Sequence, residues 1–174
     1  MTPTGLAQAE ALALRLQPEP LAAVYSSDSR RALQTAVAVA SPHDLQPIPN
    51  RKFRERSAGD FEGMGLDEVL RLRPHIWDDR SADYWGWSPP GGETFHQVLE
   101  RTTAGLDEIR ASHPDGTVAL VAHMGTVRML LCHLAGISLE GTYDLEFPST
   151  CVSVFRLVGD RVEVETLNDA SHVA

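Results

Sequence analysis

The stretch that decides the fold class of this chain is Val118-Ala119-Leu120-Val121-Ala122-His123-Met124-Gly125. Its unbroken apolar start is typical of a strand buried on both faces of a parallel sheet, and we expect a strand over 117–122. His123 and Gly125 end that strand, and apolar residues at helical spacing then predict a helix over about 126–134. A buried strand that runs directly into a helix indicates an α/β fold.

Strands and helices alternate along the rest of the chain in the same way. The first helix is expected to begin at Thr2-Pro3, an N-cap followed by a proline, and to end before Pro18. Further helices are expected over 30–40, 66–73 and 93–112, and strands over 21–26, 151–158 and 161–167, the last two joined by a turn at Gly159-Asp160. This order predicts a three-layer sandwich, in which a mostly parallel sheet is flanked by helices. No repeat or low-complexity tract divides the chain, so we expect one domain over residues 1–174.

Composition and charge argue against several classes of partner. The 174 residues carry 15 basic and 24 acidic side chains, a net charge of −9, without the basic run that a nucleic-acid backbone requires. No window approaches the ~18 consecutive apolar residues of a membrane span. The first residues also lack the basic and apolar regions of a signal peptide. We therefore expect no nucleic-acid partner, no membrane partner and a cytoplasmic protein.

The cysteines and histidines predict neither a disulfide framework nor a metal site. Cys132 and Cys151 are too few and too far apart for such a framework, and their apolar neighbours indicate two buried, reduced thiols. The seven histidines show no His-x-x-x-His spacing, and the sequence has no Cys-x-x-Cys. A structural zinc site is therefore not expected.

Two predicted strand ends carry groups suited to an anion. The stretch 25–36, Tyr25-Ser26-Ser27-Asp28-Ser29-Arg30-Arg31-Ala32-Leu33-Gln34-Thr35-Ala36, leads through small hydroxyl residues into a helix beside two arginines. The free N–H groups of a helix N-terminus favour an anion, and a guanidinium adds two parallel hydrogen bonds to a phosphate. His123, at the carboxyl end of the buried strand, is placed to hold the same group. A plain helix cap with solvated arginines, and a histidine satisfied at a strand end, remain open as alternatives.

Two further segments add polar groups between these strands. Glu55 lies between Arg54 and Arg56 and is suited to general acid catalysis, although a surface ion pair of little energetic value remains open. Pro90-Gly91-Gly92-Glu93-Thr94 is a glycine-rich turn that leads into a helix, and by itself it is a weak signal of a site.

Taken in order, these segments resemble the histidine phosphatase superfamily, also called the phosphoglycerate mutase-like family. Residues 2–9 are similar to its Leu-Thr-Pro-x-Gly-x-x-Gln-Ala helix, and residues 26–36 to its Ser-Ser-Asp-Leu-x-Arg-Ala-x-Gln-Thr-Ala stretch, with Ser29 in place of leucine. The remaining similar segments are Arg54-Glu55 through Glu62-Gly63, with Phe61 for the usual tryptophan; Pro90 through Thr94; His123-Met124-Gly125, where Met124 departs from His-Gly-Gly; and residues 147–150 and 168–172. The resemblance therefore covers the whole chain.

The resemblance implies the sandwich fold and phosphoryl transfer through a phosphohistidine, with no metal or other cofactor. It makes Arg31, ahead of its neighbour Arg30, the arginine that binds phosphate. Glu55 becomes the proton donor to the leaving oxygen and the base for the attacking water, and His123 becomes a ligand of the phosphoryl oxygens. Ser27 and Glu93 are implied, less directly, as substrate contacts.

The nucleophile of the family is the histidine of an Arg-His-Gly motif, at the end of a first strand that precedes the opening helix. This sequence contains no Arg-His-Gly. We therefore expect the chain as written to be N-terminally incomplete, to lack that strand, and to be inactive or weakly active. We also expect a gap in the sheet, with unpaired N–H and C=O groups beside Val24 and Val121.

Three functions are consistent with these residues. The resemblance favours a phosphatase acting on a small phosphorylated metabolite, because the 26 residues between Gly63 and Pro90 are short for the insertion with which phosphoglycerate mutases retain a bisphosphate. A phosphoglycerate mutase is the first alternative. A phosphate-binding protein without catalysis is the second, and Glu55 argues against it because binding alone needs no proton donor. The substrate stays open, and so does a homodimer.

Overall fold

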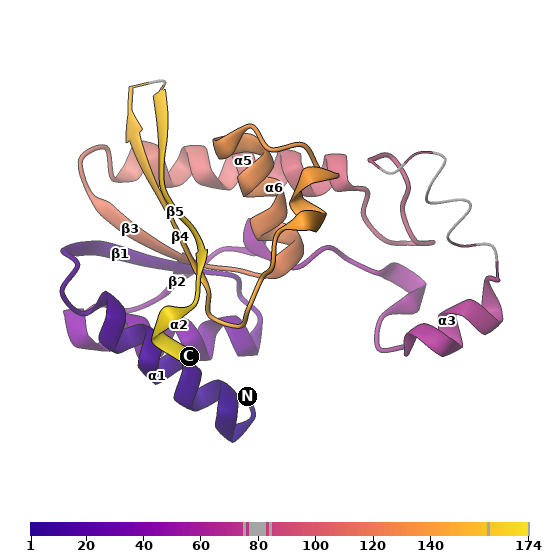
Figure 1. The fold of residues 1–174 in the computed structure, drawn as a ribbon, viewed down its shortest axis with the longest axis horizontal. Helices are drawn as coiled ribbons and strands as arrows, with labels where there is room; N and C mark the ends of the chain where they lie inside the picture. The colour runs from indigo at the N-terminus through magenta and orange to yellow at the C-terminus, as the bar shows by residue number, and fades with distance from the viewer. Residues whose placement is uncertain (75, 77–82, 84, 160, 174) are drawn as a thin grey trace.

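The computed structural model describes residues 1–74, 76, 83, 85–159 and 161–173. Its helices are α1 Pro3–Leu16, α2 Arg30–Ala40, α3 Leu66–Leu72, α5 Phe95–Ser112 and α6 Met124–Ala135 (Figure 1). Its strands are β1 Leu21–Ser26, β2 Ile48–Pro49, β3 Thr117–Val121, β4 Val152–Val158 and β5 Arg161–Asp169. Short 3-10 helices lie at Ser41–His43, Arg51–Phe53, Gly59–Phe61, Gly141–Asp144 and Ser171–Val173.

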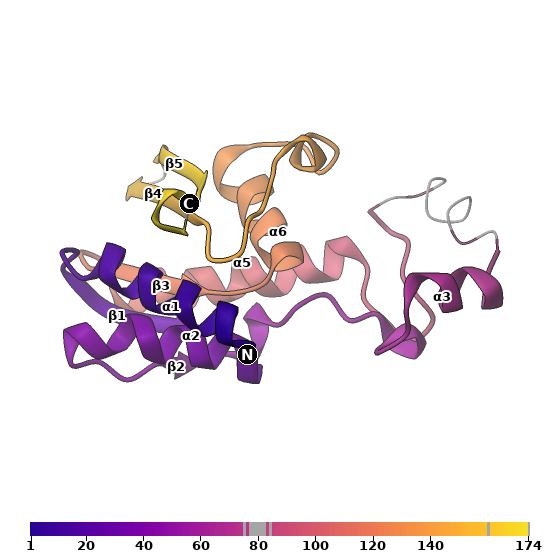
Figure 2. The same cartoon turned by 60° about the horizontal axis from the view of Figure 1, so that its bottom comes forward.

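A parallel three-stranded sheet with the order β2-β1-β3 forms the centre of the fold. Helices α1 and α2 lie on one side of it and α5 and α6 on the other, while the antiparallel hairpin β4–β5 forms a separate sheet (Figures 1 and 2). The predicted sandwich with helices on both sides of a parallel sheet is confirmed. Ser26 and Val121 are paired at the carboxyl ends of β1 and β3, so the residues that follow these two strands emerge side by side.

Two apolar clusters fix the helices whose N-termini point to this edge. Leu12, Val24, Ala36, Val39 and Ala40 pack α1 and α2 against the sheet. Alanines on the buried face of α2 allow the helix backbone to approach the sheet closely. The second cluster, Phe95, Val98, Met129 and Leu139, joins α5 to α6. The N-termini of α2 and α6 are therefore positioned by the packing of these helices in the core.

The gap expected beside Val24 is wrong. Val24 is fully buried and pairs with Ala119 of β3, and β2 pairs with the other edge of β1 at Tyr25 and Ser26. The expectation of unpaired groups beside Val121 agrees with the structure, because in the described part of the chain no strand pairs with the side of β3 that faces away from β1. Val152, next to the start of the hairpin, packs against the same core cluster as Val121.

Element boundaries differ from the expected ones where a cap decides them. Thr94 and Gln97 form a capping box, with Gln97 N–H donating to the Thr94 hydroxyl and Thr94 N–H to the Gln97 side chain, so α5 begins at Phe95 and not at residue 93. Helix α6 begins at Met124, two residues earlier than expected, because His123 is its N-cap. Asp160 of the predicted hairpin turn lies outside the described residues.

Two further expectations concern the cysteines and the membrane. Cys132 and Cys151 are free thiols, but each is half-buried, not fully buried as expected, and burial raises the pKa of both. None of the helices in the described ranges is long and apolar enough to cross a lipid bilayer.

Candidate active site

His123 joins the ends of β1 and β3 through hydrogen bonds to three residues of the predicted segment 25–36. Its Nε2 atom lies 2.9 Å from Ser27 Oγ and 3.1 Å from Ser29 Oγ, and its Nδ1 atom lies 3.1 Å from Nη2 of Arg31. A guanidinium only donates hydrogen bonds, so Nδ1 accepts and Nε2 carries the ring proton. The structure therefore brings Ser27, Arg31 and His123 together around one imidazole.

The imidazole of His123 is held in its neutral form. Burial lowers its pKa, the charge of Arg31 lowers it further, and the nearby Glu55 carboxylate only partly opposes this shift. His123 is 8% exposed, and both of its ring nitrogens have hydrogen-bond partners. A neutral Nε2–H is a hydrogen-bond donor, which is the role that the resemblance implies for this residue toward phosphoryl oxygens.

The lowered pKa of His123 predicts that the fold loses stability in mild acid. The unfolded chain binds a proton near the ordinary value of 6.5, whereas the folded chain resists it, so the unfolded state holds more protons below pH 6.5. We expect the free energy of unfolding to fall as the pH decreases from 6.5 toward the lower folded-state pKa. Urea unfolding at a series of pH values measures this slope, and His123→Gln should flatten it. An unchanged slope in His123→Gln would contradict the assignment.

Glu55 reaches the same edge of the sheet from a separate loop. Its Oε1 accepts a hydrogen bond from Arg56 N–H at 2.9 Å, and its Oε2 accepts one from Gly125 N–H at 3.4 Å. Gly125 lies in the first turn of α6, where N–H groups have no partner inside the helix. A carboxylate there also interacts favourably with the helix dipole. Glu55 therefore lies against the helix that His123 caps.

Gly125 permits this contact because it has no side chain. A Cβ atom at residue 125 would lie 2.4 Å from Glu55 Oε1. We expect Gly125→Ala to displace the Glu55 carboxylate and to lower the rate of phosphomonoester hydrolysis by about tenfold or more, since a misplaced catalytic group is costly. The midpoint temperature of thermal unfolding should stay the same or rise slightly, because alanine is more favourable than glycine in a helix by up to about 1 kcal/mol. A parallel loss of stability and rate would instead indicate damage to the fold.

No role is assigned from the sequence to two residues that the structure places at the site, Ser29 and Asp28. Ser29 appeared only as a departure from the family pattern, yet its hydroxyl contacts His123 and it is the N-cap residue of α2. Asp28 receives two hydrogen bonds from Arg54, both at 2.6 Å, and these bonds lower its pKa. The Asp28–Arg54 pair connects the β1–α2 loop to the loop of Glu55. In the sequence, the only indication of this pair is the polar composition of the two segments that carry Asp28 and Arg54.

Glu93 contacts the loop that carries Glu55 and helix α5. Its carboxylate accepts hydrogen bonds from Arg101 at 2.8 and 3.0 Å and from Ser57 N–H at 2.9 Å. Burial would raise the pKa of Glu93, but Arg101 and the Ser57 N–H outweigh burial and lower it. The substrate contact implied for Glu93 stays a prediction, and its observed contacts are within the protein.

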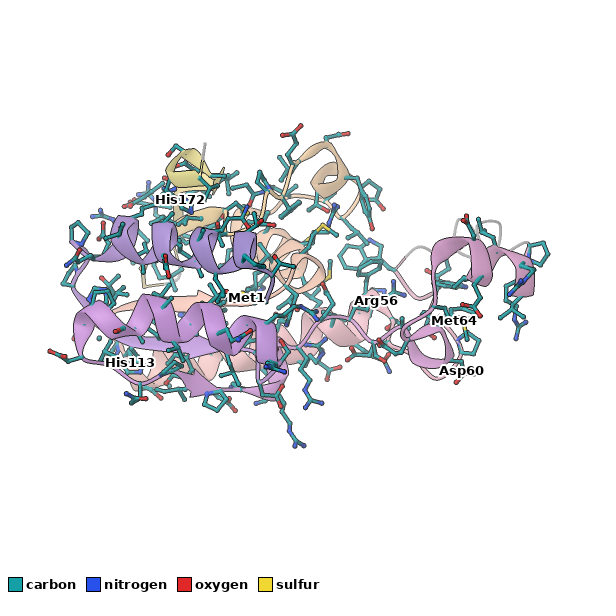
Figure 3. All side chains as sticks on the ribbon, turned by 90° about the horizontal axis from the view of Figure 1, so that it is seen from below. Met1, Arg56, Asp60, Met64, His113 and His172 are labelled. Carbon is teal, nitrogen blue, oxygen red and sulfur yellow. The ribbon has the colours of Figure 1, made fainter. Side chains whose placement is uncertain are left out.

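Arg56 connects this loop to the region around α3. Its guanidinium donates to Glu93 O at 2.8 Å and to Trp87 O at 2.9 Å, and it stacks over the ring of Phe95. Figure 3 shows Arg56 where the body of the protein meets the projecting segment that carries Asp60 and Met64. The loop that bears Glu55 is therefore anchored immediately after that residue.

The arrangement can bind a phosphate and deliver a proton to it. Arg31 is exposed beyond its contact with His123, so its guanidinium can donate to an anion while it retains that contact. The N–H groups at the start of α2 and α6 add partial positive charge at the same edge. Glu55 supplies a carboxyl group beside this position, as acid–base catalysis on a phosphate ester requires.

Comparisons with known proteins show the family of this chain. Residues 1–170 match the family model described as histidine phosphatase superfamily (branch 1). The chain is 32% identical over 173 residues to phosphoglycerate mutase-like protein 4 of Arabidopsis thaliana, covering 97% of this chain and 74% of that protein. It is 28% identical over 169 residues to phosphoserine phosphatase 1 of Hydrogenobacter thermophilus, covering 97% and 80%. The solved structure of Bacillus stearothermophilus YhfR superimposes with a TM-score of 0.90 at 28% identity, covering 100% of this chain and 87% of that one. The chain is an enzyme that belongs to the histidine phosphatase superfamily.

Proposed function

We propose that this protein hydrolyses the phosphate monoester of a small metabolite. The observation that carries the proposal is the hydrogen bond between Arg31 and His123. His123 is the N-cap of α6, and an N–H in the first turn of the same helix donates a hydrogen bond to the Glu55 carboxylate. Cationic and neutral donors thus face one side of a bound phosphate, and a carboxyl group faces it from another loop. This set of groups matches the needs of phosphoryl transfer, which are charge stabilisation and proton delivery.

Each residue has a defined part in the proposed reaction. Arg31 and the Nε2–H of His123 hold the phosphoryl oxygens as negative charge builds on them. Phosphorus bonds to the nucleophilic histidine that the family resemblance implies, and Glu55 donates a proton to the ester oxygen as the bond between that oxygen and phosphorus breaks. The resulting Glu55 carboxylate then takes a proton from the water that attacks the phosphorylated intermediate, and inorganic phosphate leaves. Ser27 and Ser29 hold the imidazole ring in position until a phosphoryl oxygen replaces their hydroxyl groups as the acceptor of the Nε2–H.

The proposal includes where the nucleophile would lie. The family resemblance implies a histidine at the end of a strand, and the free edge of β3 offers a place for a parallel strand that would end beside His123. The ammonium group of Met1 donates to Gln34, one helical turn after Arg31, so the N-terminus of α1 also lies near the site. We propose that an Arg-His-Gly strand in this place gives full activity and that the 174 residues alone are weakly active.

The proposed substrate is a small phosphorylated metabolite, and the two named relatives suggest different outcomes for its phosphoryl group. The phosphoserine phosphatase relative supports transfer to water. The mutase-like relative favours the second candidate, transfer between the hydroxyl groups of phosphoglycerate. The short segment between Gly63 and Pro90 supports the phosphatase, because it offers few residues to retain a bisphosphate.

A comparison of two proteins tests the proposal. The 174-residue chain and the same chain preceded by an apolar strand ending in Arg-His-Gly are assayed for phosphate release from O-phosphoserine, 3-phosphoglycerate and p-nitrophenyl phosphate. We expect slow release by the first and a gain of several orders of magnitude in the second. No release by either protein would refute the phosphatase. Interconversion of 2- and 3-phosphoglycerate sustained by 2,3-bisphosphoglycerate would establish the mutase in its place.

A further inference from the structure

Arg101, in the middle of α5, makes four hydrogen bonds to groups that surround Glu55. Its Nη1 donates to Lys52 O at 2.6 Å and its Nη2 to Glu55 O at 3.2 Å. The same guanidinium donates to both carboxylate oxygens of Glu93. No motif of the sequence analysis included Arg101. One side chain therefore ties the backbone of the Glu55 loop to a helix that carries none of the predicted site residues.

Glu93 extends this connection to the other side of Glu55. Its Oε2 atom accepts from Arg101 and also from Ser57 N–H, two residues after Glu55. The side chains of Arg101 and Glu93 are only 19% and 27% exposed. A charge-assisted, two-pronged pair of this kind is stronger and more directional than an exposed ion pair. The backbone on both sides of Glu55 is thus held by the Arg101–Glu93 pair.

The packing of the loop on α5 explains why Arg101 can reach these carbonyl groups. Phe53, fully buried, lies against Gly105, where a Cβ atom would come within 2.8 Å of the Phe53 ring. Gly105 follows Arg101 by four residues and so shares its face of α5. The Thr126 hydroxyl of α6 donates to Arg54 O at 2.7 Å, which fixes the residue before Glu55.

We propose that Arg101 and Glu93 are positioning residues, which hold the Glu55 carboxyl group at the N-terminus of α6. The inference rests on the proposed function, because Glu55 is the proton donor there. It also gives Glu93 a defined part that needs no contact with substrate. The guanidinium must bond two backbone carbonyls and a carboxylate together, and lysine cannot reproduce this planar set of donors.

Loss of the pair is expected to change turnover rather than substrate binding. His123 bonds to Arg31, Ser27 and Ser29 and not to Arg101. The Arg101 charge is the smallest of the influences on the pKa of His123, so the phosphate-binding groups keep their arrangement and KM should change little. A displaced proton donor lowers kcat, by about a hundredfold for a shift near 1 Å. Arg101→Lys should lower kcat less than Arg101→Met does. Arg156→Met is the matched control, because Arg156 pairs with Glu165 on the exposed hairpin, far from the site in sequence and fold.

A double variant separates positioning from folding. Arg101→Met alone leaves the Glu93 charge half-buried without its partner, which destabilises the protein. Adding Glu93→Leu removes that unpaired charge, so the thermal stability should recover. We expect kcat to stay low in the double variant, since nothing then holds the Glu55 loop. Recovery of both stability and kcat would overturn the proposal and leave the pair a structural role only.

A second readout needs no turnover. Because the Glu55 carboxylate contacts Gly125 N–H, the NMR shift of that amide should follow the protonation of Glu55 in the wild-type protein. The double variant should lose this pH-dependent shift, while the Arg156→Met control keeps it. The same titration curve in all three proteins would overturn the positioning role. A loss of the shift in a chain that hydrolyses no phosphomonoester would support the positioning role and count against the proposed function alone.

Discussion

We expect Glu55→Gln to lower the rate of phosphomonoester hydrolysis by about a hundredfold to ten-thousandfold, the usual contribution of a positioned acid or base. The amide keeps one oxygen, so it can retain the stronger of the two contacts, the 2.9 Å hydrogen bond from Arg56 N–H, while the contact with Gly125 N–H is lost because an NH2 group cannot accept. The variant also lacks the acidic proton that the proposed reaction delivers to the leaving oxygen. Steady-state hydrolysis of O-phosphoserine at saturating substrate, by the chain preceded by the Arg-His-Gly strand, measures the effect.

The control for this variant lies seven residues further along the same loop. Glu62 Oε1 accepts a hydrogen bond from Ala58 N–H at 2.8 Å, so it is a carboxylate with a similar backbone contact but away from His123. Glu62→Gln should keep the wild-type rate. Equal rates in Glu55→Gln and the wild-type protein would remove Glu55 from the reaction.

Arg31→Met weakens the binding of inorganic phosphate by about tenfold to a hundredfold, the value of a hydrogen bond to a charged group. The Arg31 side chain is exposed, so its replacement leaves the core intact. Its loss removes the cation nearest to His123. Isothermal titration calorimetry with phosphate at low ionic strength measures the affinity, because added salt screens exposed charges.

Arg30→Met is the matched control on the same helix. Arg30 lies in a shallow apolar groove between α1 and α2, next to Leu6, Leu33 and Val37, and has no described contact with His123. We expect its replacement to change phosphate affinity less than twofold, within the small effect of a distant exposed charge. A greater loss in Arg30→Met than in Arg31→Met would reverse the assignment.

Much of the fold could be predicted from local patterns. The apolar run before His123 and the helical spacing after it located β3 and α6, and the alanine-rich periodicity after Arg30 located α2. The position of the free sheet edge could be predicted only in part, at Val121 but not at Val24, because pairing depends on which strands are neighbours in space. Val24 and Ala119 lie far apart in sequence, and nothing local showed that their strands pair.

The candidate site shows the same division. Arg31, Glu55 and His123 could be named as candidates because each lies in a segment that resembles a motif of the family. Arg101 was not, because it lies in an amphipathic helix where an arginine normally faces solvent, and only the fold shows that carbonyl groups of another loop surround it. Ser29 stands where the family pattern has leucine, and its contact with His123 exists only because β1 and β3 are neighbours in the sheet.

The most direct test of the central claim is an NMR titration of the ¹⁵N-labelled protein with inorganic phosphate, followed at the imidazole of His123. A phosphate held by Arg31 and His123 should shift the Nε2 resonance in a saturable way, and Arg31→Met should raise the phosphate concentration needed for half of that shift. The imidazole of His113, which bonds Tyr25 elsewhere in the fold, should not move. A His123 resonance that stays unchanged at saturating phosphate would contradict the claim that this cluster is a phosphate site.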